Sequence, residues 1–436
     1  MNINASSNVG LLYCGIKNML RCDDAEVVQG IAHYVISQHR GLRLLSVLIE
    51  RTRNSAVPGV IAVIGWLRSF LSVRSGKHRD GGVWIARLGN ERRAIETMLS
   101  FAPELCWTEL KFGLLPDAEA LRALVRNFAP RRVFKLVRRL HRQHEFFKVL
   151  RVVEFIGYCT RYQEIFRQGR FSLAVMSSHS NPHGIAFNLA ARQREIPVVL
   201  ITHGMPIRPV ARLSYDLAVV HCEAARQTYL AEGCRITRVL IHGRRQDHAQ
   251  MPSDHLQRLV VGVFLCKDVN EEGLRAIIAQ LLSYPEVSGI LIRPHPKNLW
   301  VGLSKWVASL NNERVSLDSN RSMFGDVEAA DVVLAGNSSV LIDAVVAGRP
   351  GGYLTDLDHA PGDLHSFVER GLIYPVRIAR GDSRWNPDAM LRFYQRPGWP
   401  DVLRLFANID EDETAVAARA GAIMRELAEA GGPATD

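Results

Sequence analysis

Short apolar runs alternate with segments of helical period from Gly82 to Leu354, and this alternation limits the folds open to the chain. A strand buried on both faces reads as a continuous apolar run, whereas a helix repeats its apolar positions every three or four residues. Strands that alternate with helices of about 10–15 residues form parallel βαβ units. The pattern therefore predicts an α/β protein built on parallel sheets.

A polar segment without any period, Gly243–Leu256, interrupts the alternation, and we interpret it as a linker. It divides the chain into two Rossmann-like domains, residues 1–250 and 251–410, followed by a C-terminal helix in residues 411–436. The 436 residues are enough for two domains of roughly 150 to 250 residues each. Residues 1–80 are expected to be mostly helical. We expect the two domains to face a ligand cleft, with ligands bound beyond the carboxyl ends of the strands.

The same pattern predicts individual elements. In the first domain we expect strands at Val83–Leu88, Leu105–Phe112, Leu173–Met176, Val198–Thr202, Ala218–His221 and Val239–His242. In the second we expect strands at Leu259–Leu265, Gly289–Ile292, Arg314–Leu317, Asp331–Leu334 and Gly351–Leu354. The expected helices are Glu91–Leu99, Asp117–Gln168 with a break at Pro130, Gly184–Arg194, Glu223–Glu232, Glu271–Leu282, Val301–Leu310, Arg321–Ala329, Val340–Ala347 and Glu411–Ala430.

Several features predict a cytoplasmic protein. The seven cysteines are scattered and never spaced as C-x-x-C, which disfavours a disulfide framework or a zinc knuckle. The first residues lack the basic and apolar regions of a secretory signal. The longest apolar run, Val57–Leu67, ends after about 11 residues, whereas a membrane span needs about 20. We interpret that run as a core helix or an interfacial segment.

The net charge of +10 favours a polyanionic partner. Much of the excess lies between Arg131 and Arg151, where basic and apolar residues alternate at helical spacing and predict one basic amphipathic helix. Such a helix suits an anionic membrane surface, here the inner membrane face, although a solvated helix face is the alternative. No zinc finger or RNA-recognition signature is present, so nucleic acid is not an expected partner.

Two loops in the second half carry groups suited to phosphate. Arg293-Pro294-His295-Pro296-Lys297 follows an expected strand, and its prolines hold a histidine and two cations at the strand's carboxyl end. Gly336-Asn337-Ser338-Ser339 lies between a strand and a helix, where hydroxyls and helix amides can bind an anion. A structural turn and an ordinary helix cap are the alternatives.

Two loops in the first half suggest an acceptor side. His203 follows a strand and precedes Gly204, and an imidazole with an ordinary pKa near 6.5 can take a proton from an acceptor hydroxyl. The other loop is rich in hydrogen-bonding groups; its candidates are Ser178, His179, Asn181 and His183, the last of which competes with His203 for the role of base. The acidic pair Glu271-Glu272 opens a helix, where acids usually complement the dipole.

Together these motifs resemble two groups of bacterial enzymes. His-Gly-x-Pro, Arg-Pro-His-Pro and Asn-Ser-Ser-x-x-x-Asp, in this order, look like the CDP-glycerol glycerophosphotransferases of teichoic acid synthesis. They are also similar to capsule transferases that use CMP-linked sialic acid or Kdo. The resemblance spans about Ser177–Leu354 and implies the GT-B fold and a metal-independent, inverting transfer to a glycan or lipid-linked acceptor of a cell-surface polymer.

The resemblance also implies roles for individual residues. His295, Ser338 and Ser339 would contact the donor phosphate. The chemistry of the two loops adds Arg293, Lys297 and Asn337 to the expected donor side. His203 matches the proposed base, and Asp343 matches an acidic position in the helix after the serines. The donor would be a CMP- or CDP-linked substrate, and no cofactor or metal is expected.

Two other functions stay open. A sugar-nucleotide 2-epimerase shares the two-domain fold and a serine/glycine phosphate loop, although the Glu pair that usually follows that loop in epimerases is not present here. A non-catalytic GT-B module that scaffolds a membrane assembly is the other alternative. Binding of CMP, CDP or UDP would separate an enzyme from a scaffold, and product analysis would separate a transferase from an epimerase.

Overall fold

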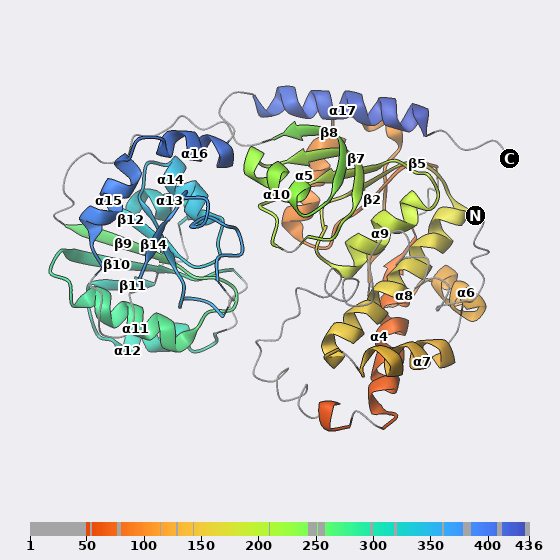
Figure 1. Cartoon of the computed structure of the whole chain (residues 1–436), viewed down its shortest axis with the longest axis horizontal. Helices are drawn as coiled ribbons and strands as arrows, with labels where there is room; N and C mark the ends of the chain where they lie inside the picture. The colour runs from red at the N-terminus through yellow and green to blue at the C-terminus, as the bar shows by residue number, and fades with distance from the viewer. Residues whose placement is uncertain are drawn as a thin grey trace. The chain divides into compact units, whose positions relative to one another are not determined.

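The computed structural model describes residues 49–52, 55–75, 80–113, 115–127, 130–142, 144–208, 210–242, 251, 258–296, 300–317, 321–359, 362–377, 385–407 and 412–431. This part of the chain forms two compact units (Figure 1). The first contains the described residues up to His221, Ala225–His242 and the described residues from Asp412 onward. The second contains Cys222–Ala224 and the remaining described residues up to Ala407. Most of the expected linker lies outside the described residues.

The first unit is built on a six-stranded parallel sheet with the order β3-β2-β5-β6-β7-β8. Its strands are β2 (Asp80–Ile85), β3 (Thr108–Glu109), β5 (Arg170–Met176), β6 (Val198–Ile201), β7 (Ser214–Val220) and β8 (Arg235–Ile241). Its helices are α4 (Val57–Ser72), α5 (Gly89–Leu99), α6 (Ala118–Asn127), α7 (Pro130–Leu140), α8 (Phe146–Gln168), α9 (Pro182–Arg192), α10 (Glu223–Ala231) and α17 (Glu413–Ala430). A separate antiparallel pair joins β1 (Val73–Arg74) to β4 (Lys111–Phe112).

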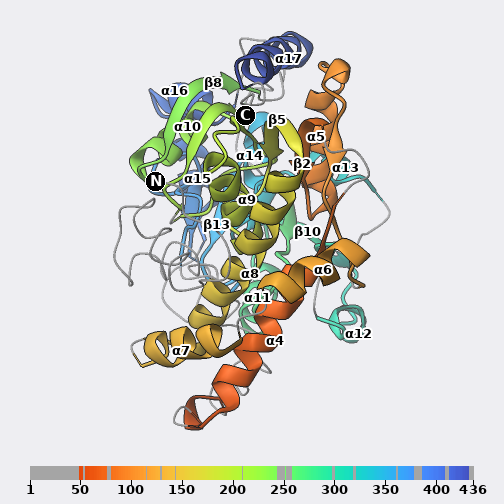
Figure 2. The same ribbon diagram turned by 90° about the vertical axis from the view of Figure 1, so that its right-hand side faces the viewer.

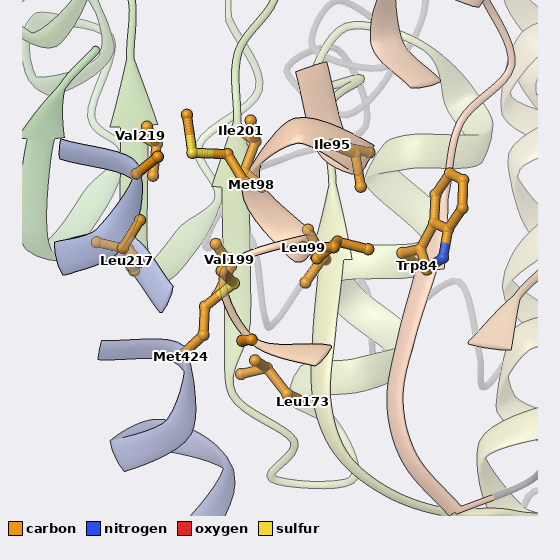
Figure 3. Close-up of a cluster of buried hydrophobic side chains, with 14 of the residues drawn as sticks. Trp84, Ile95, Met98, Leu99, Leu173, Val199, Ile201, Leu217, Val219 and Met424 are labelled. Atoms are coloured by element: carbon orange, nitrogen blue, oxygen red, sulfur yellow. The ribbon is translucent and has the colours of Figure 1, made fainter. Parts of the chain in front are cut away.

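The C-terminal helix α17 is part of the core of this unit. Figure 3 shows Met424 of α17 beside Leu173 and Val199 of the sheet. Met98 of α5 belongs to the same buried cluster, so α5 and α17 pack on one face of the sheet. A side chain at Gly421 would place its Cβ 2.5 Å from the carbonyl oxygen of Phe101, so the absence of a side chain lets α17 approach closely.

The second unit has a six-stranded parallel sheet with the order β11-β10-β9-β12-β13-β14. Its strands are β9 (Leu259–Phe264), β10 (Val287–Arg293), β11 (Val315–Leu317), β12 (Val332–Ala335), β13 (Gly351–Leu354) and β14 (Tyr374–Val376). Its helices are α11 (Glu271–Leu282), α12 (Leu303–Ser309), α13 (Met323–Ala329), α14 (Val340–Val346), α15 (Pro387–Gln395) and α16 (Trp399–Phe406). The expected α/β class with two Rossmann-like parallel sheets is confirmed.

The strand expected near Leu105–Phe112 is present only as two short strands, and its start and continuity are wrong. The chain there forms a short 3-10 turn (Pro103–Leu105), the edge strand β3 and then β4, which pairs with β1 instead of the main sheet. Cys106 adopts a left-handed backbone with φ 47°, and this bend ends any extended run before β3 begins.

The single basic helix expected at Arg131–Arg151 is also wrong, because α7 ends at Leu140 and α8 begins at Phe146. The buried ring of His141 packs edge-on against the ring of Phe146, with 5.4 Å between centroids. The Glu50 carboxylate accepts a hydrogen bond from the Phe146 amide at 2.9 Å and satisfies the first turn of α8. No helix among the described residues is long and apolar enough to cross a membrane.

Candidate functional site

The strand order of the first unit places a ligand position between β2 and β5. The chain runs outward from these two neighbours in opposite directions, and ligands of such sheets bind at this reversal, beyond the carboxyl ends of the strands. Ile85 pairs with Met176, and Met176 pairs with Leu200, so the three strands end in one row. The loops that follow β2, β5 and β6 therefore emerge side by side.

Ser177 and His203 meet at this edge. Ser177 follows β5 directly and is buried, and its hydroxyl lies 2.9 Å from Nδ1 of His203, which follows β6. The hydrogen bond fixes the orientation of the imidazole. His203 itself is half-buried. Within the described part of the chain, and apart from its two chain neighbours, a Cβ at Gly204 would have no heavy atom within 4 Å, so there is open space at the residue that follows the histidine.

Glu91 contributes a buried carboxylate near Ser177 and His203. It belongs to the first turn of α5 and is 1% exposed, and its Oε2 accepts hydrogen bonds from the amides of Arg87 at 2.7 Å and Leu88 at 3.0 Å. Burial lowers the pKa of His203, and the Glu91 carboxylate opposes that effect. His203 is therefore neutral at pH 7, which is the protonation state that a general base requires.

The loop after β5 is held by its own hydrogen bonds. Asn181 donates through Nδ2 to the Ser178 hydroxyl at 2.8 Å. The buried His179 exchanges a 2.8 Å hydrogen bond with the hydroxyl of Tyr229, through Nδ1. A Cβ at Gly184 would lie 1.8 Å from the Ser178 carbonyl oxygen, so only glycine lets α9 approach this loop.

His183 does not reach the acceptor position expected for it. Its ring is 1% exposed and packs edge-on against Phe112 and Tyr158, with centroid distances of 5.1 and 6.0 Å. Neither ring nitrogen has a hydrogen-bond partner within the described part of the chain. Burial, with the charges of Arg87 and Arg151, lowers the pKa of His183 to about 3. The side chain is an uncharged part of the core.

The second unit has its reversal between β9 and β12, in the strand order that Rossmann domains use. Phe264 pairs with Arg293 on one side and with Ala335 on the other, so three strands again end in one row. His295 follows β10 and the 336–339 loop follows β12. Their strands are two steps apart in the sheet, a separation of about 10 Å at the strand ends. Both expected phosphate loops thus leave the same edge of one sheet.

Asn337 is fully engaged within the protein. Its Nδ2 donates to the carbonyl oxygen of Gly362 at 2.9 Å, and its Oδ1 accepts from the Leu364 amide at 2.8 Å. Its backbone amide donates to Asp358 at 2.7 Å. A Cβ at Gly336 would lie 2.3 Å from an Asp358 carboxylate oxygen. This geometry makes Asn337 a residue that positions the loop; it leaves little capacity for a ligand.

The two serines are more open. Ser338 is half-buried, and Ser339 is exposed. Ser339 precedes α14, but its side chain makes no capping hydrogen bond. Asp343, on the first turn of α14, is half-buried. The serine hydroxyls are therefore the groups of this loop best placed for an external ligand.

Arg293 is occupied by a structural contact. Its guanidinium forms an ion pair with Asp326, which is fully buried, and donates to the carbonyl oxygen of Arg321 at 2.8 Å. These contacts, all made through Nη1, anchor α13. His295, two residues further on, is half-buried. Lys297 lies outside the described residues.

The sequence did not indicate three residues that organise these edges, namely Ser177 as the partner of His203, Glu91 and Asp358. Ser177 was visible as part of a polar loop. Glu91 had only the signal of an acid in a first helical turn, which usually complements the helix dipole. Asp358 lies in the irregular segment after β13, and its contact with Asn337 depends on tertiary folding.

No protein-family model and no curated protein sequence matches this chain. Among solved structures it is similar to UDP-GlcNAc 2-epimerase from Neisseria meningitidis bound to UDP-GlcNAc. The identity is 13%, the match covers 79% of this chain and 98% of that one, and the TM-score is 0.41.

It is also similar to two glycosyltransferases. The calicheamicin glycosyltransferase CalG4 is 15% identical over 82% of this chain and 96% of that one, with a TM-score of 0.43. The glycotransferase of kitacinnamycin is 13% identical over 81% of this chain and 97% of that one, with a TM-score of 0.40. These values describe a distant likeness of fold.

Proposed function

We propose that the chain is a metal-independent glycosyltransferase or glycerophosphotransferase that transfers a group from a nucleotide-activated donor to an acceptor hydroxyl. The observation that carries this proposal is the arrangement around His203. A neutral imidazole, oriented by Ser177, lies at the ligand-binding edge of a parallel sheet and beside open space. It has the protonation state and the orientation that a general base needs, and the open space at Gly204 offers an approach for an acceptor.

The second unit supplies the donor side of the proposal. The Ser338 and Ser339 hydroxyls and the His295 imidazole leave one edge of the sheet, next to the reversal of strand order. Hydrogen-bond donors fixed at such an edge stabilise the charge that grows on a departing phosphate. We assign to them the donor phosphate, with Asp343 nearby and Lys297 as a further cation of the same loop.

The proposed reaction is a single displacement. Nε2 of His203 takes the proton of the acceptor hydroxyl while the acceptor oxygen forms a bond to the transferred group. The bond between that group and the nucleotide phosphate breaks, and the nucleotide leaves with the electron pair. The resemblance of the motifs favours a CMP- or CDP-linked donor and a saccharide or polyol acceptor of a cell-surface polymer.

The test uses variants that are expected to affect different quantities, either the rate of transfer or the affinity for nucleotide. His203→Ala is expected to lower transfer by roughly 10²- to 10⁴-fold, the range for loss of a general base. It should leave the affinity for CMP, CDP or UDP, measured by calorimetry, unchanged. Ser338→Ala/Ser339→Ala and His295→Ala are expected to weaken nucleotide binding. His144→Ala, which removes a histidine before α8, is the matched control and should behave as the unmodified protein.

Two results would contradict the proposal. The first is normal turnover in His203→Ala. The second is nucleotide affinity that is unchanged in the serine double variant, or no binding of any of the three nucleotides to the unmodified protein. Release of an epimer from a nucleotide-sugar in the absence of an acceptor would assign the chain to the epimerases instead.

A further inference from the structure

The helix α4 exposes aliphatic side chains in a row. Val57, Val60 and Ile64 are 44%, 53% and 59% exposed and lie on one helical face, because residues three and four apart share a face. The opposite face, which includes Ala62 and Trp66, is buried. A single exposed aliphatic residue is ordinary, whereas contiguous exposed apolar surface is typical of an interaction site.

The neighbouring helix α7 exposes cations. Arg131, Arg132, Lys135, Arg138 and Arg139 are all exposed, and the sequence of α7 contains no acidic residue. Its other face, with Val133 and Leu140, is buried. The sequence of α4 also lacks acidic residues. The two helices therefore present positive charge and aliphatic surface, and neither contributes an acidic residue.

The two helices are in direct contact. A Cβ at Gly59 of α4 would lie 2.1 Å from the ring of Phe134 on α7. Gly59 belongs to the buried face of α4, so α7 packs against that face at the level of Val60. Figures 1 and 2 both show α4 and α7 at the end of the first unit opposite α17. We use the name lipid patch for Val57, Val60, Ile64 and the five α7 cations.

We propose that the lipid patch docks this protein on an anionic phospholipid bilayer. The aliphatic side chains would enter the boundary between headgroups and acyl chains, as those of interfacial helices do. The arginines and lysine would remain at the headgroup level and contact lipid phosphates, since their long stems let the charge reach water. Charge complementarity selects an anionic surface, and the aliphatic row selects a membrane over a soluble polyanion.

The test measures binding of the full-length protein to vesicles by flotation, without substrate, so that its result is independent of the proposed transfer reaction. We expect binding to vesicles of equal parts phosphatidylcholine and phosphatidylglycerol, weaker binding at high salt, and little binding to phosphatidylcholine alone. Ile64→Ser is expected to lower the affinity about tenfold. Arg131→Gln and Arg138→Gln should each lower it about fivefold.

Matched controls come from the same unit. Leu230→Ser removes an aliphatic side chain that is 41% exposed on α10, and Lys111→Gln removes an exposed cation on β4. Both should bind vesicles as the unmodified protein does, and circular dichroism checks that every variant is folded. Equal binding by Ile64→Ser and the unmodified protein would overturn the proposal. So would self-association, or tight binding to RNA, without any binding to anionic vesicles.

Discussion

The Ser177 hydroxyl lies 2.9 Å from Nδ1 of His203, and this contact joins the loops after two adjacent strands. For His203 to act as a base through Nε2, Nδ1 must carry the proton and donate it to Ser177. In the proposed reaction Ser177 would therefore act through the imidazole, as a positioning residue. We expect Ser177→Ala to lower kcat roughly tenfold, about the worth of one neutral hydrogen bond.

Ser177→Thr is the matched variant, because it keeps the hydroxyl and should restore most of the activity. Steady-state kinetics would show the loss in kcat, with KM for the nucleotide donor nearly constant. A loss confined to KM would mean that Ser177 contacts the substrate instead of orienting His203.

The pH dependence of transfer should reflect the effect of the buried Glu91 carboxylate on the pKa of His203. Burial places the pKa of His203 below 6.5, so activity should rise as pH increases through that lowered pKa and be constant near pH 7. Glu91→Gln retains an oxygen that can accept from the Arg87 and Leu88 amides but removes the negative charge. We expect the acid limb of kcat/KM to move to lower pH in this variant.

A profile of kcat/KM from about pH 4.5 to 8 would measure the shift. Asp216→Asn, a change of another carboxylate of the same sheet, is the control and should leave the limb in place. An unchanged limb in Glu91→Gln would show that another group controls the titration.

His183 should make the fold sensitive to acid. Its pKa is about 3 in the folded protein and near 6.5 in the unfolded chain. Between these values the unfolded state binds a proton that the folded state excludes, so the free energy of unfolding falls as pH falls. The expected loss from this residue is about 1.4 kcal/mol per pH unit below 6.5.

His183→Leu fills a similar volume without the titrating group. Urea unfolding at several pH values should show that the variant gains stability relative to the unmodified protein as pH falls from about 6.5 to 4. Because both ring nitrogens lack partners among the residues that the structure describes, the variant should also be no less stable at pH 7. Equal acid sensitivity of the two proteins would contradict the assignment of His183 to the core.

The sequence predicted the second sheet well where its strands are fully buried. The bounds expected for α11 and β13 match the structure, because a buried apolar run and an acid-rich helix start are strong local signals. It missed β14, α15 and α16. Strand β14 contains Pro375 and lies at the sheet edge, where the apolar signal is weak.

The candidate sites divide in the same way. His203 and the 336–339 loop could be predicted, because their positions at strand ends follow from local patterns. The hydrogen bond of Ser177 to His203 and the electrostatic effect of Glu91 on it could not, because they depend on β2, β5 and β6 being neighbours in that order. Local sequence likewise does not show that the charge of Arg293 is matched by Asp326.

That last pair gives a prediction that separates a structural cation from a ligand-binding one. Asp326 is fully buried, and Arg293 is its ion-pair partner. Removal of one partner from a buried pair leaves an uncompensated charge and typically costs about 3–5 kcal/mol. We therefore expect Arg293→Met to lower the free energy of unfolding by about 3 kcal/mol in urea titrations. Arg293→Met/Asp326→Leu should recover much of this loss, because no buried charge remains.

Nucleotide affinity provides the contrasting measurement. At a temperature where Arg293→Met remains folded, calorimetry should give an affinity close to that of the unmodified protein, since the guanidinium is directed to Asp326 and the Arg321 carbonyl. If Arg293 instead bound the donor phosphate, Arg293→Met would show weaker nucleotide binding and normal stability. The double variant Arg293→Met/Asp326→Leu provides a further check. If it regains stability but binds nucleotide weakly, Arg293 contacts the donor phosphate after all.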